Sequence, residues 1–202
     1  ENCRFLIIFG CLNFFLCNYI NIMFVQTQET PNPNSLKFLP GKKVSMNGTY
    51  EILDKNESNN ELVRNILAIN GVTGIFLSED FLSVNKKEEV KWEDLKHIII
   101  SFINDFYSDG KENVISKNQD NTTTSSLREI EKKIIKILDT KVRPAVARDG
   151  GDIKFKEFKN GVVKVQLQGS CSGCPSSIMT LKQGVQNLLC HYIPEVKEVL
   201  AI

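Results

Sequence analysis

Apolar residues follow strand-like and helix-like spacings from residue 24 onward, and a polar stretch divides this pattern into two groups. The clearest element of the first group is a helix from Lys91 to Tyr107, where Trp92, Leu95 and Ile99 begin a series at helical spacing. The other elements predicted in this group are strands at 24–28 and 36–39, a helix at 62–67 and a hairpin of strands at 75–77 and 81–84. Together they predict a first α+β domain over residues 23–107.

Residues 108–125 are mostly Asp, Asn, Ser, Thr, Lys and Gly. Such a composition cannot bury enough apolar surface to become ordered, so this stretch predicts a flexible polar linker. Ser126 and Glu129 have the spacing of a capping box that starts a helix, and Pro144 is expected to end or bend that helix.

The rest of the chain predicts a second small domain over residues 126–202. Its expected elements are a turn at 149–152, a hairpin turning at 159–161, a helix starting at Pro175 with Ile178, Leu181, Val185, Leu188 and Tyr192 on its buried face, and a final strand at 196–202. The predicted fold class is therefore α+β, with two small α+β domains joined by a flexible polar linker.

Residues 1–22 precede the first foldable segment. No charged residue occurs between Phe5 and Val25, and about 20 apolar residues are enough to span a bilayer. One interpretation is a membrane anchor or a targeting segment, although the stretch lacks the character of an amphipathic transit peptide. The interpretation we favour is that Met23 starts the working protein and that residues 1–22 lie upstream of it.

The amino-acid composition makes some classes of function improbable for this protein. With 42% hydrophobic and 24% charged residues, the chain resembles ordinary soluble globular proteins. Its net charge is +1 and no basic stripe is interleaved with aromatic residues, so nucleic acid is not an expected partner. Three of the six cysteines (Cys3, Cys11 and Cys17) lie in residues 1–22, and no dense disulfide framework is visible, which predicts a reducing compartment.

The candidate chemistry lies in the run GSCSGCP, where Cys171 and Cys174 stand between a predicted strand and a predicted helix. The partial positive charge of a helix N-terminus is expected to favour thiolate over thiol. A pair of thiolates can form a soft metal site, a redox site or both. Two ligands are nevertheless too few for a tetrahedral zinc ion or an ordinary iron–sulfur cluster, which take about four.

Three chemistries remain open for this loop. A thiol–disulfide oxidoreductase uses the same spacing at a helix start, although the aromatic residue that usually precedes it is missing here. A zinc site would need more ligands from Cys190, His191 or His97, and the first two lie at the other end of the predicted helix, on the order of 20 Å away. In the third alternative, two chains meet at their cysteine loops and supply four thiolates by symmetry.

Three charged residues lie near this turn. Asp149 and Asp152 could form a catalytic carboxylate pair, but aspartates beside two glycines usually form turns. Arg143 is interpreted as a solvated side chain, with a contact to a partner or support of the thiolate charge as the alternatives.

The second domain closely resembles the C-terminal domain of NifU/Nfu proteins. The resemblance rests on residues 142–146 (VRPAV), 149–153 (DGGDI), 165–177 (VQLQGSCSGCPSS) and 180–182 (TLK). The run TPNPNSLKF at 30–38 similarly resembles the opening of the Nfu-type N-terminal domain. The two resemblances cover nearly everything from Met23 to the end, whereas residues 1–22 match nothing in the family.

This resemblance implies an iron–sulfur cluster scaffold or carrier rather than an enzyme. Cys171 and Cys174 of two subunits would bind a [4Fe-4S] cluster, with [2Fe-2S] as an alternative, and the protein would deliver the cluster to apo-proteins. The implied partners are a second copy of the chain, apo iron–sulfur clients and an upstream cluster donor. The implied location is the bacterial cytoplasm or the mitochondrial matrix.

Overall fold

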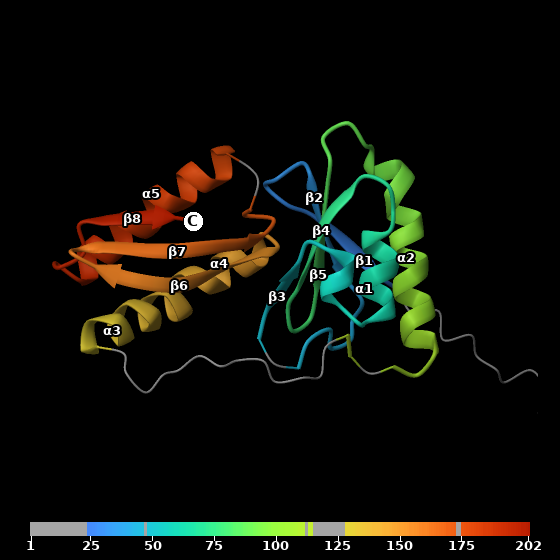
Figure 1. Ribbon diagram of the computed structural model, residues 1–202, viewed down its shortest axis with the longest axis horizontal. Coiled ribbons are helices and arrows are strands. Elements are labelled where there is room, and N and C mark those ends of the chain that lie inside the picture. Colours follow the sequence, from blue (N-terminus) through green and yellow to red (C-terminus); the bar gives the residue numbers. More distant parts are fainter. Residues whose placement is uncertain (1–23, 47, 112, 115–127, 173–174) are drawn as a thin grey trace, which may run out of the picture.

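The computed structural model describes residues 24–46, 48–111, 113–114 and 128–202 except Gly173 and Cys174, and only the helical backbone of residues 175–177. These residues form two α+β units that lie side by side (Figure 1), so the predicted fold class is confirmed. Residues 1–22 lie outside the described residues, as does most of the predicted linker. Within the described part of the chain, no helix is both long enough and apolar enough to cross a bilayer.

The N-terminal domain is a five-stranded antiparallel sheet in the order β1-β2-β5-β4-β3, covered on one face by two helices. Its elements are β1 (Gln26–Glu29), β2 (Ser35–Leu39), β3 (Tyr50–Ile52), η1 (Lys55–Glu57), α1 (Glu61–Leu67), β4 (Val72–Leu77), β5 (Leu82–Lys86) and α2 (Trp92–Ser108). The main core lies between sheet and helices, where Phe38, Ile99 and Ile103 are fully buried. Val114, inside the predicted linker, also packs into this core, and its N–H donates to the Val44 carbonyl at 2.8 Å.

Residues of β4 face opposite sides of the sheet in alternation. Ile75 and Leu77 belong to the helix-side core, whereas Phe76 between them does not. Phe76 is nevertheless only 1% exposed and its neighbour Phe81 only 2%. Since successive strand residues point to opposite faces, Phe76 lies on the face turned away from α1 and α2. In Figure 1 that face is turned toward the second domain.

The C-terminal domain packs its helices against a three-stranded sheet. Its elements are α3 (Glu129–Ile137), η3 (Leu138–Val142), α4 (Arg143–Arg148), β6 (Gly151–Lys159), β7 (Val162–Gly169), α5 (Pro175–Tyr192) and β8 (Glu198–Ala201). The strand order is β6-β7-β8, with β6 antiparallel and β8 parallel to β7. The core between them contains Ile134, Ile153, Val163 and Leu189.

Two sequence expectations for α3, the first helix of the C-terminal domain, need correction. The helix begins at Glu129, not at Ser126, which lies outside the described residues, and the capping interaction joins Arg128 to Glu131. The Glu131 carboxylate accepts the Arg128 backbone N–H at 2.8 Å. The expected disturbance at Pro144 is present as the π-helical turn η3 just before it, because proline cannot supply an N–H to the preceding turn.

The predicted hairpin is confirmed, with Asn160 and Gly161 both at positive φ, as a type I′ turn requires. The buried face predicted for α5 is partly wrong. Tyr192 is 49% exposed, whereas Leu189 is fully buried and Ile193 follows it into the core. The apolar face of α5 is wide. The helical spacing of the sequence predicted residues at the edge of this face, whereas Leu189 and Ile193 lie at its centre.

Candidate functional site

The cysteine loop begins where the β6–β7 hairpin ends. Gly169 is the last residue of β7 and pairs with Gly151, the first residue of β6. Cys171 follows two residues later, is 7% exposed and belongs to the C-terminal core. Cys174 lies outside the described residues. The structure therefore places one of the two predicted ligands, beside the start of α5 at Pro175.

The start of the loop is a tight turn fixed by its own hydrogen bonds. The Ser172 N–H and hydroxyl both donate to the Gly169 carbonyl, at 3.1 and 2.8 Å. The Ser170 N–H donates to the Gly150 carbonyl at 3.2 Å, and its hydroxyl donates to the Asp149 carbonyl. The loop is thus tied to the turn that precedes β6.

The Cys171 sulfur lies directly over Gly151. A Cβ atom added at residue 151 would be 2.7 Å from Cys171 Sγ and 2.6 Å from the Gln168 carbonyl oxygen. Both separations are shorter than real Cβ atoms show, so only glycine leaves room for the thiol at this place.

Gly151→Ala is therefore expected to destabilise the C-terminal domain by about 1–3 kcal/mol, as overpacking of a filled interior does. Urea unfolding followed by far-UV circular dichroism measures this change. Gly184→Ala on α5 is the matched control, because nothing lies within 4 Å of its added Cβ. That substitution should be neutral or stabilising, since alanine favours a helix interior over glycine. Equal effects of the two substitutions would contradict the close packing at Gly151.

The ionisation of Cys171 differs from the sequence expectation. Burial raises the pKa of its thiol to about 11, and the nearby carboxylates of Asp149 and Asp152 raise the pKa as well, against a lowering hydrogen bond from Ser170. The direction of this shift is opposite to the lowering expected from a helix N-terminus, and its first cause is burial. Metal binding would have to displace the thiol proton.

An apolar cavity of about 620 Å³ opens beside Cys171. Its walls come from η3, α4 and α5, and from the N-terminal turn at Pro31 and Asn32. The aliphatic side chains that line the cavity are those of Val142, Val146, Leu181, Val185 and Leu188. Cys171 therefore lines a cavity to which both domains contribute.

The other metal-ligand candidates are not brought to this loop. His97 is exposed on α2, His191 is exposed at the end of α5 with its ring against Tyr192, and Cys190 is partly buried beside it. Within the ranges that the structure describes, no three His, Cys, Asp or Glu side chains gather closely enough to hold a metal ion.

The charged residues near the turn form an ion pair that the sequence did not reveal. Arg143 Nε and Nη2 donate to the two carboxylate oxygens of Asp152, both at 2.8 Å. The Asp152 side chain is 5% exposed, so it is a buried strand residue rather than a turn residue or a catalytic partner of Asp149. Arg143 is paired as well as partly solvated, because its side chain is 36% exposed. No local signal could have joined these two residues, which are nine positions apart, one at the start of α4 and the other in β6.

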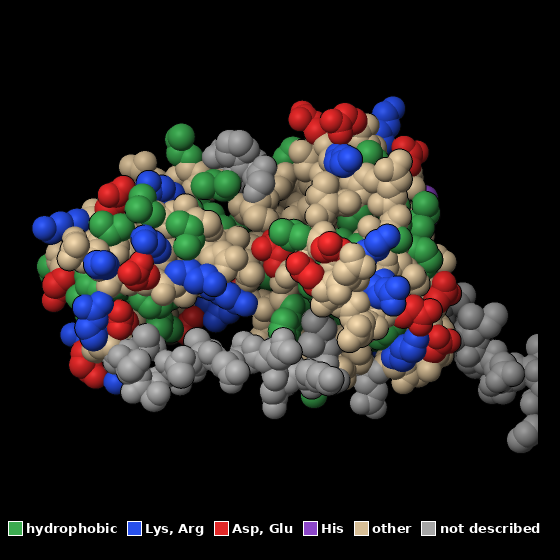
Figure 2. Space-filling model, in the orientation of Figure 1, with side chains coloured by type: hydrophobic (Ala, Val, Ile, Leu, Met, Phe, Trp, Pro, Cys, Tyr) green, Lys and Arg blue, Asp and Glu red, His purple; other side chains and the backbone are tan. Residues whose placement is uncertain are grey.

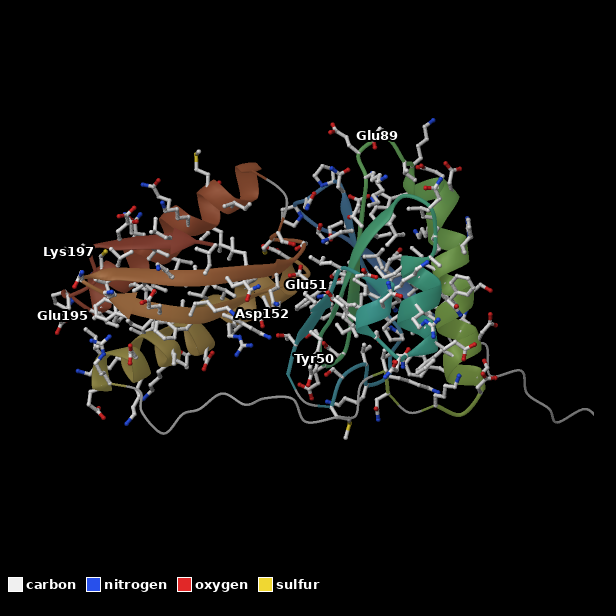
Figure 3. The ribbon with its side chains drawn as sticks, in the orientation of Figure 1. Tyr50, Glu51, Glu89, Asp152, Glu195 and Lys197 are labelled. Carbon is white, nitrogen blue, oxygen red and sulfur yellow. The ribbon has the colours of Figure 1, made fainter. Side chains whose placement is uncertain are left out.

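Three side chains of the N-terminal domain bind the cysteine loop, and no motif in that part of the sequence indicates these contacts. The Asn32 amide donates to the Ser170 carbonyl at 3.0 Å, and the Asn85 amide donates to the Gly169 carbonyl at 3.1 Å. Glu51 Oε1 accepts the Gly169 N–H at 2.9 Å and the Ser172 hydroxyl at 3.0 Å. Figure 3 shows Glu51 and Asp152 on the two sides of this boundary.

Comparison with known proteins identifies the two domains. Residues 25–110 match the family described as scaffold protein Nfu/NifU N terminal, and residues 134–200 match the NifU-like domain. The protein named NFU1 iron-sulfur cluster scaffold homolog, mitochondrial, of Drosophila sechellia is 44% identical over 182 residues, which cover 88% of this chain and 64% of that protein. The Drosophila persimilis protein of the same name is 43% identical with the same coverage.

The chain thus spans less than two thirds of the length of these relatives. Among solved structures, the NifU-like protein from Saccharomyces cerevisiae is 29% identical and covers 50% of this chain and 91% of its own, with a TM-score of 0.45. That TM-score is too low to support a conclusion about the fold. The sequence matches are sufficient by themselves, because both domains are matched in the same order. This chain belongs to the NifU/Nfu family, with an Nfu N-terminal domain followed by a NifU-like domain.

Proposed function

We propose that this protein is an iron–sulfur cluster scaffold or carrier whose cargo is bound between two copies of the chain through Cys171 and Cys174. The observation that supports this most is the cysteine loop itself, at the strand–helix junction of a domain that matches the NifU-like family. The curated relatives carry the name of iron–sulfur cluster scaffold.

Ligand number explains why two copies are needed. A [4Fe-4S] cluster is held by about four cysteine thiolates, and each chain offers two in this loop. A cluster held by two ligands from each protein lies at an interface, where incoming thiols of a client can replace the ligands. This arrangement suits delivery of the cluster to an apo-protein rather than turnover of a substrate, so we propose a carrier and not an enzyme.

The environment of Cys171 disfavours the oxidoreductase alternative. Catalytic cysteines of that class are partly exposed and have a lowered pKa. Cys171 is instead buried, and burial raises its pKa to about 11. A zinc-bridged dimer would use the same four thiolates, and the experiment below separates it from a cluster carrier. Because the relatives are named mitochondrial, we propose the mitochondrial matrix as the location.

Anaerobic reconstitution with iron and sulfide tests this function. We expect a brown protein with about two irons and two sulfides per chain, since a shared [4Fe-4S] cluster divides between two copies. Light scattering after size exclusion should give a dimer for the loaded protein, and an apo-enzyme that requires a [4Fe-4S] cluster should become active when mixed with it. A colourless protein that retains only zinc, or a cluster held by a single chain, would contradict the proposal.

A further inference from the structure

One face of the N-terminal sheet is covered by the cysteine-loop end of the C-terminal domain. Phe76 and Phe81 are buried on this face with ring centroids 6.0 Å apart, outside the core that the helices cover. Lys37 lies on the same face, with its ammonium 4.0 Å from the centre of the Phe81 ring. That ammonium also donates to the Ala147 carbonyl at the end of α4, at 3.1 Å.

The turn before β6 lies against the same sheet face. The Ser83 hydroxyl, fully buried, donates to the Gly150 carbonyl at 2.8 Å. Gly150 has φ of +83°, and a Cβ added there would lie 2.8 Å from Ser83 Oγ. Glycine is therefore required at this position for two reasons. Any other residue would be strained at this positive φ, and its side chain would push the two domains apart.

The N-terminal domain also holds the loop on both sides of Cys171. Asn32 binds the carbonyl of Ser170, and Glu51 binds the N–H of Gly169 and the hydroxyl of Ser172. Hydrogen-bond donors of this kind stabilise the negative charge on cluster sulfurs. In this arrangement two such donors, the Gly169 N–H and the Ser172 hydroxyl, bind the Glu51 carboxylate instead. A cluster with its thiolates would also bring further negative charge beside Glu51, and like charges at short range repel.

We propose that this sheet face is a docking surface for the turn before β6 and residues 169–172 of the same chain, and that docking of these residues opposes cluster loading. We define the docking surface by Asn32, Lys37, Glu51, Phe76, Phe81, Ser83 and Asn85. The effect on loading rests on the proposed function, whereas docking itself does not. A second subunit then has to compete for the loop with a surface tethered in the same chain, at an effective concentration on the order of millimolar.

The contact has the character of a reversible one. It is made largely by hydrogen bonds to backbone groups, and interfaces between domains of this polar kind usually permit relative motion. Figure 2 shows Lys and Arg side chains of the C-terminal domain near Asp and Glu side chains of the N-terminal domain along this boundary.

Alkylation of the apo full-length chain tests docking without any cluster. Glu51→Ala removes the acceptor of two hydrogen bonds from the loop. Loss of a hydrogen bond to a charged group is expected to shift the equilibrium between docked and undocked loop roughly tenfold toward the undocked state. We expect iodoacetamide to label Cys171 roughly tenfold faster in this variant at fixed pH, with tandem mass spectrometry assigning the label. Cys190, at the other end of α5, is the internal reference and should not change.

Glu89→Ala is the matched control, because Glu89 is exposed and lies away from the boundary in Figure 3. Ser83→Glu is a second variant that places a carboxylate against the Gly150 carbonyl, and fluorescence of Trp92 checks that its N-terminal domain is folded. Cys171 labelling at the wild-type rate in both Glu51→Ala and folded Ser83→Glu would overturn the docking proposal.

Cluster loading tests the second half of the proposal. During anaerobic reconstitution, Glu51→Ala and Ser83→Glu should acquire the visible cluster absorption several-fold faster than wild type and Glu89→Ala. Faster alkylation with unchanged loading would overturn the gating role and support docking alone. If no variant and no wild-type chain takes up iron, the proposed function fails, while the alkylation rates still decide whether the domains dock.

Discussion

Replacing Cys174 with serine is expected to abolish retention of iron and sulfide after anaerobic reconstitution. Each chain then offers one thiolate, and a cluster shared by two chains loses half of its four ligands. Serine presents a hard oxygen in place of a soft sulfur, and it is a poor ligand for cluster iron. Iron and sulfide content after desalting, together with the visible absorption, measures the loss.

Cys171→Ser should have the same effect on the cluster, with an additional cost. Because Cys171 is 7% exposed within the C-terminal core, a serine hydroxyl there needs a hydrogen-bond partner or costs roughly 1–3 kcal/mol. Far-UV circular dichroism must therefore show that this variant is folded. Cys190→Ser is the matched control, since Cys190 is only partly buried at the other end of α5. Cluster retention by folded Cys174→Ser, or its loss in Cys190→Ser, would contradict the proposed ligand set.

The elements that the sequence predicted best are those with an unbroken local pattern. Val163, Val165 and Leu167 alternate along β7, and all three are buried. The Asn160–Gly161 turn follows from the preference of these two residues for positive φ. In such segments the pattern of side chains determines the local structure, and tertiary contacts then add to it.

The missed elements depend on partners distant in the sequence. β3 has only three residues, with the charged Glu51 at its centre, so no apolar alternation marks it. It forms because Glu51 pairs with Phe76 of β4, 25 positions away. In the same way, nothing near Asn32 or Ser83 signals that these side chains meet residues 150 and 170.

The position of the candidate ligands before a helix was therefore predictable from the sequence, whereas the surroundings of Cys171 were not. The GSCSGCP run and its position before a helix are visible in the chain itself. The burial of Cys171, by contrast, results from Gly151, from the packing of the C-terminal core and from the N-terminal side chains that hold the loop on both sides, which only the folded structure brings together. For this reason the sequence predicted a lowered pKa for this thiol, whereas burial raises the pKa.

Breaking the Arg143–Asp152 ion pair is expected to lower the free energy of unfolding of the C-terminal domain by about 3 kcal/mol, because a carboxylate is left buried without its cation. The Asp152 side chain is 5% exposed, and without Arg143 it retains only the Thr49 hydroxyl at 2.6 Å and the Ile153 N–H at 2.8 Å. Arg143→Ala should speed hydrogen exchange of the most protected β6 and β7 amides roughly 100-fold. Arg148→Ala, an exposed arginine on the same helix, is the matched control.

The effect of Arg143→Ala should depend on pH in a defined direction. Burial alone would raise the pKa of the Asp152 carboxyl, but hydrogen bonds from Arg143 and Thr49 and the charge of Arg143 outweigh burial and hold this pKa below its ordinary value. A lowered pKa contributes stability above the unfolded value of about 3.9, and that stability is lost as the pH falls through the folded value. The difference between wild type and Arg143→Ala in urea unfolding should therefore be full at pH 7 and shrink below about pH 4.

A purely structural role for the arginine stem would give a difference that does not change with pH, and that result would exclude the charge as its cause.

The position of the pair explains why its charge matters. Arg143 also binds Asp139 in η3 at 3.0 Å, so one guanidinium joins the π-helical turn, α4 and β6. Through Asp152 it reaches Thr49 of the N-terminal domain. The same ion pair thus orients the turn that precedes β6, against which the cysteine loop is held, and one end of the boundary between the two domains.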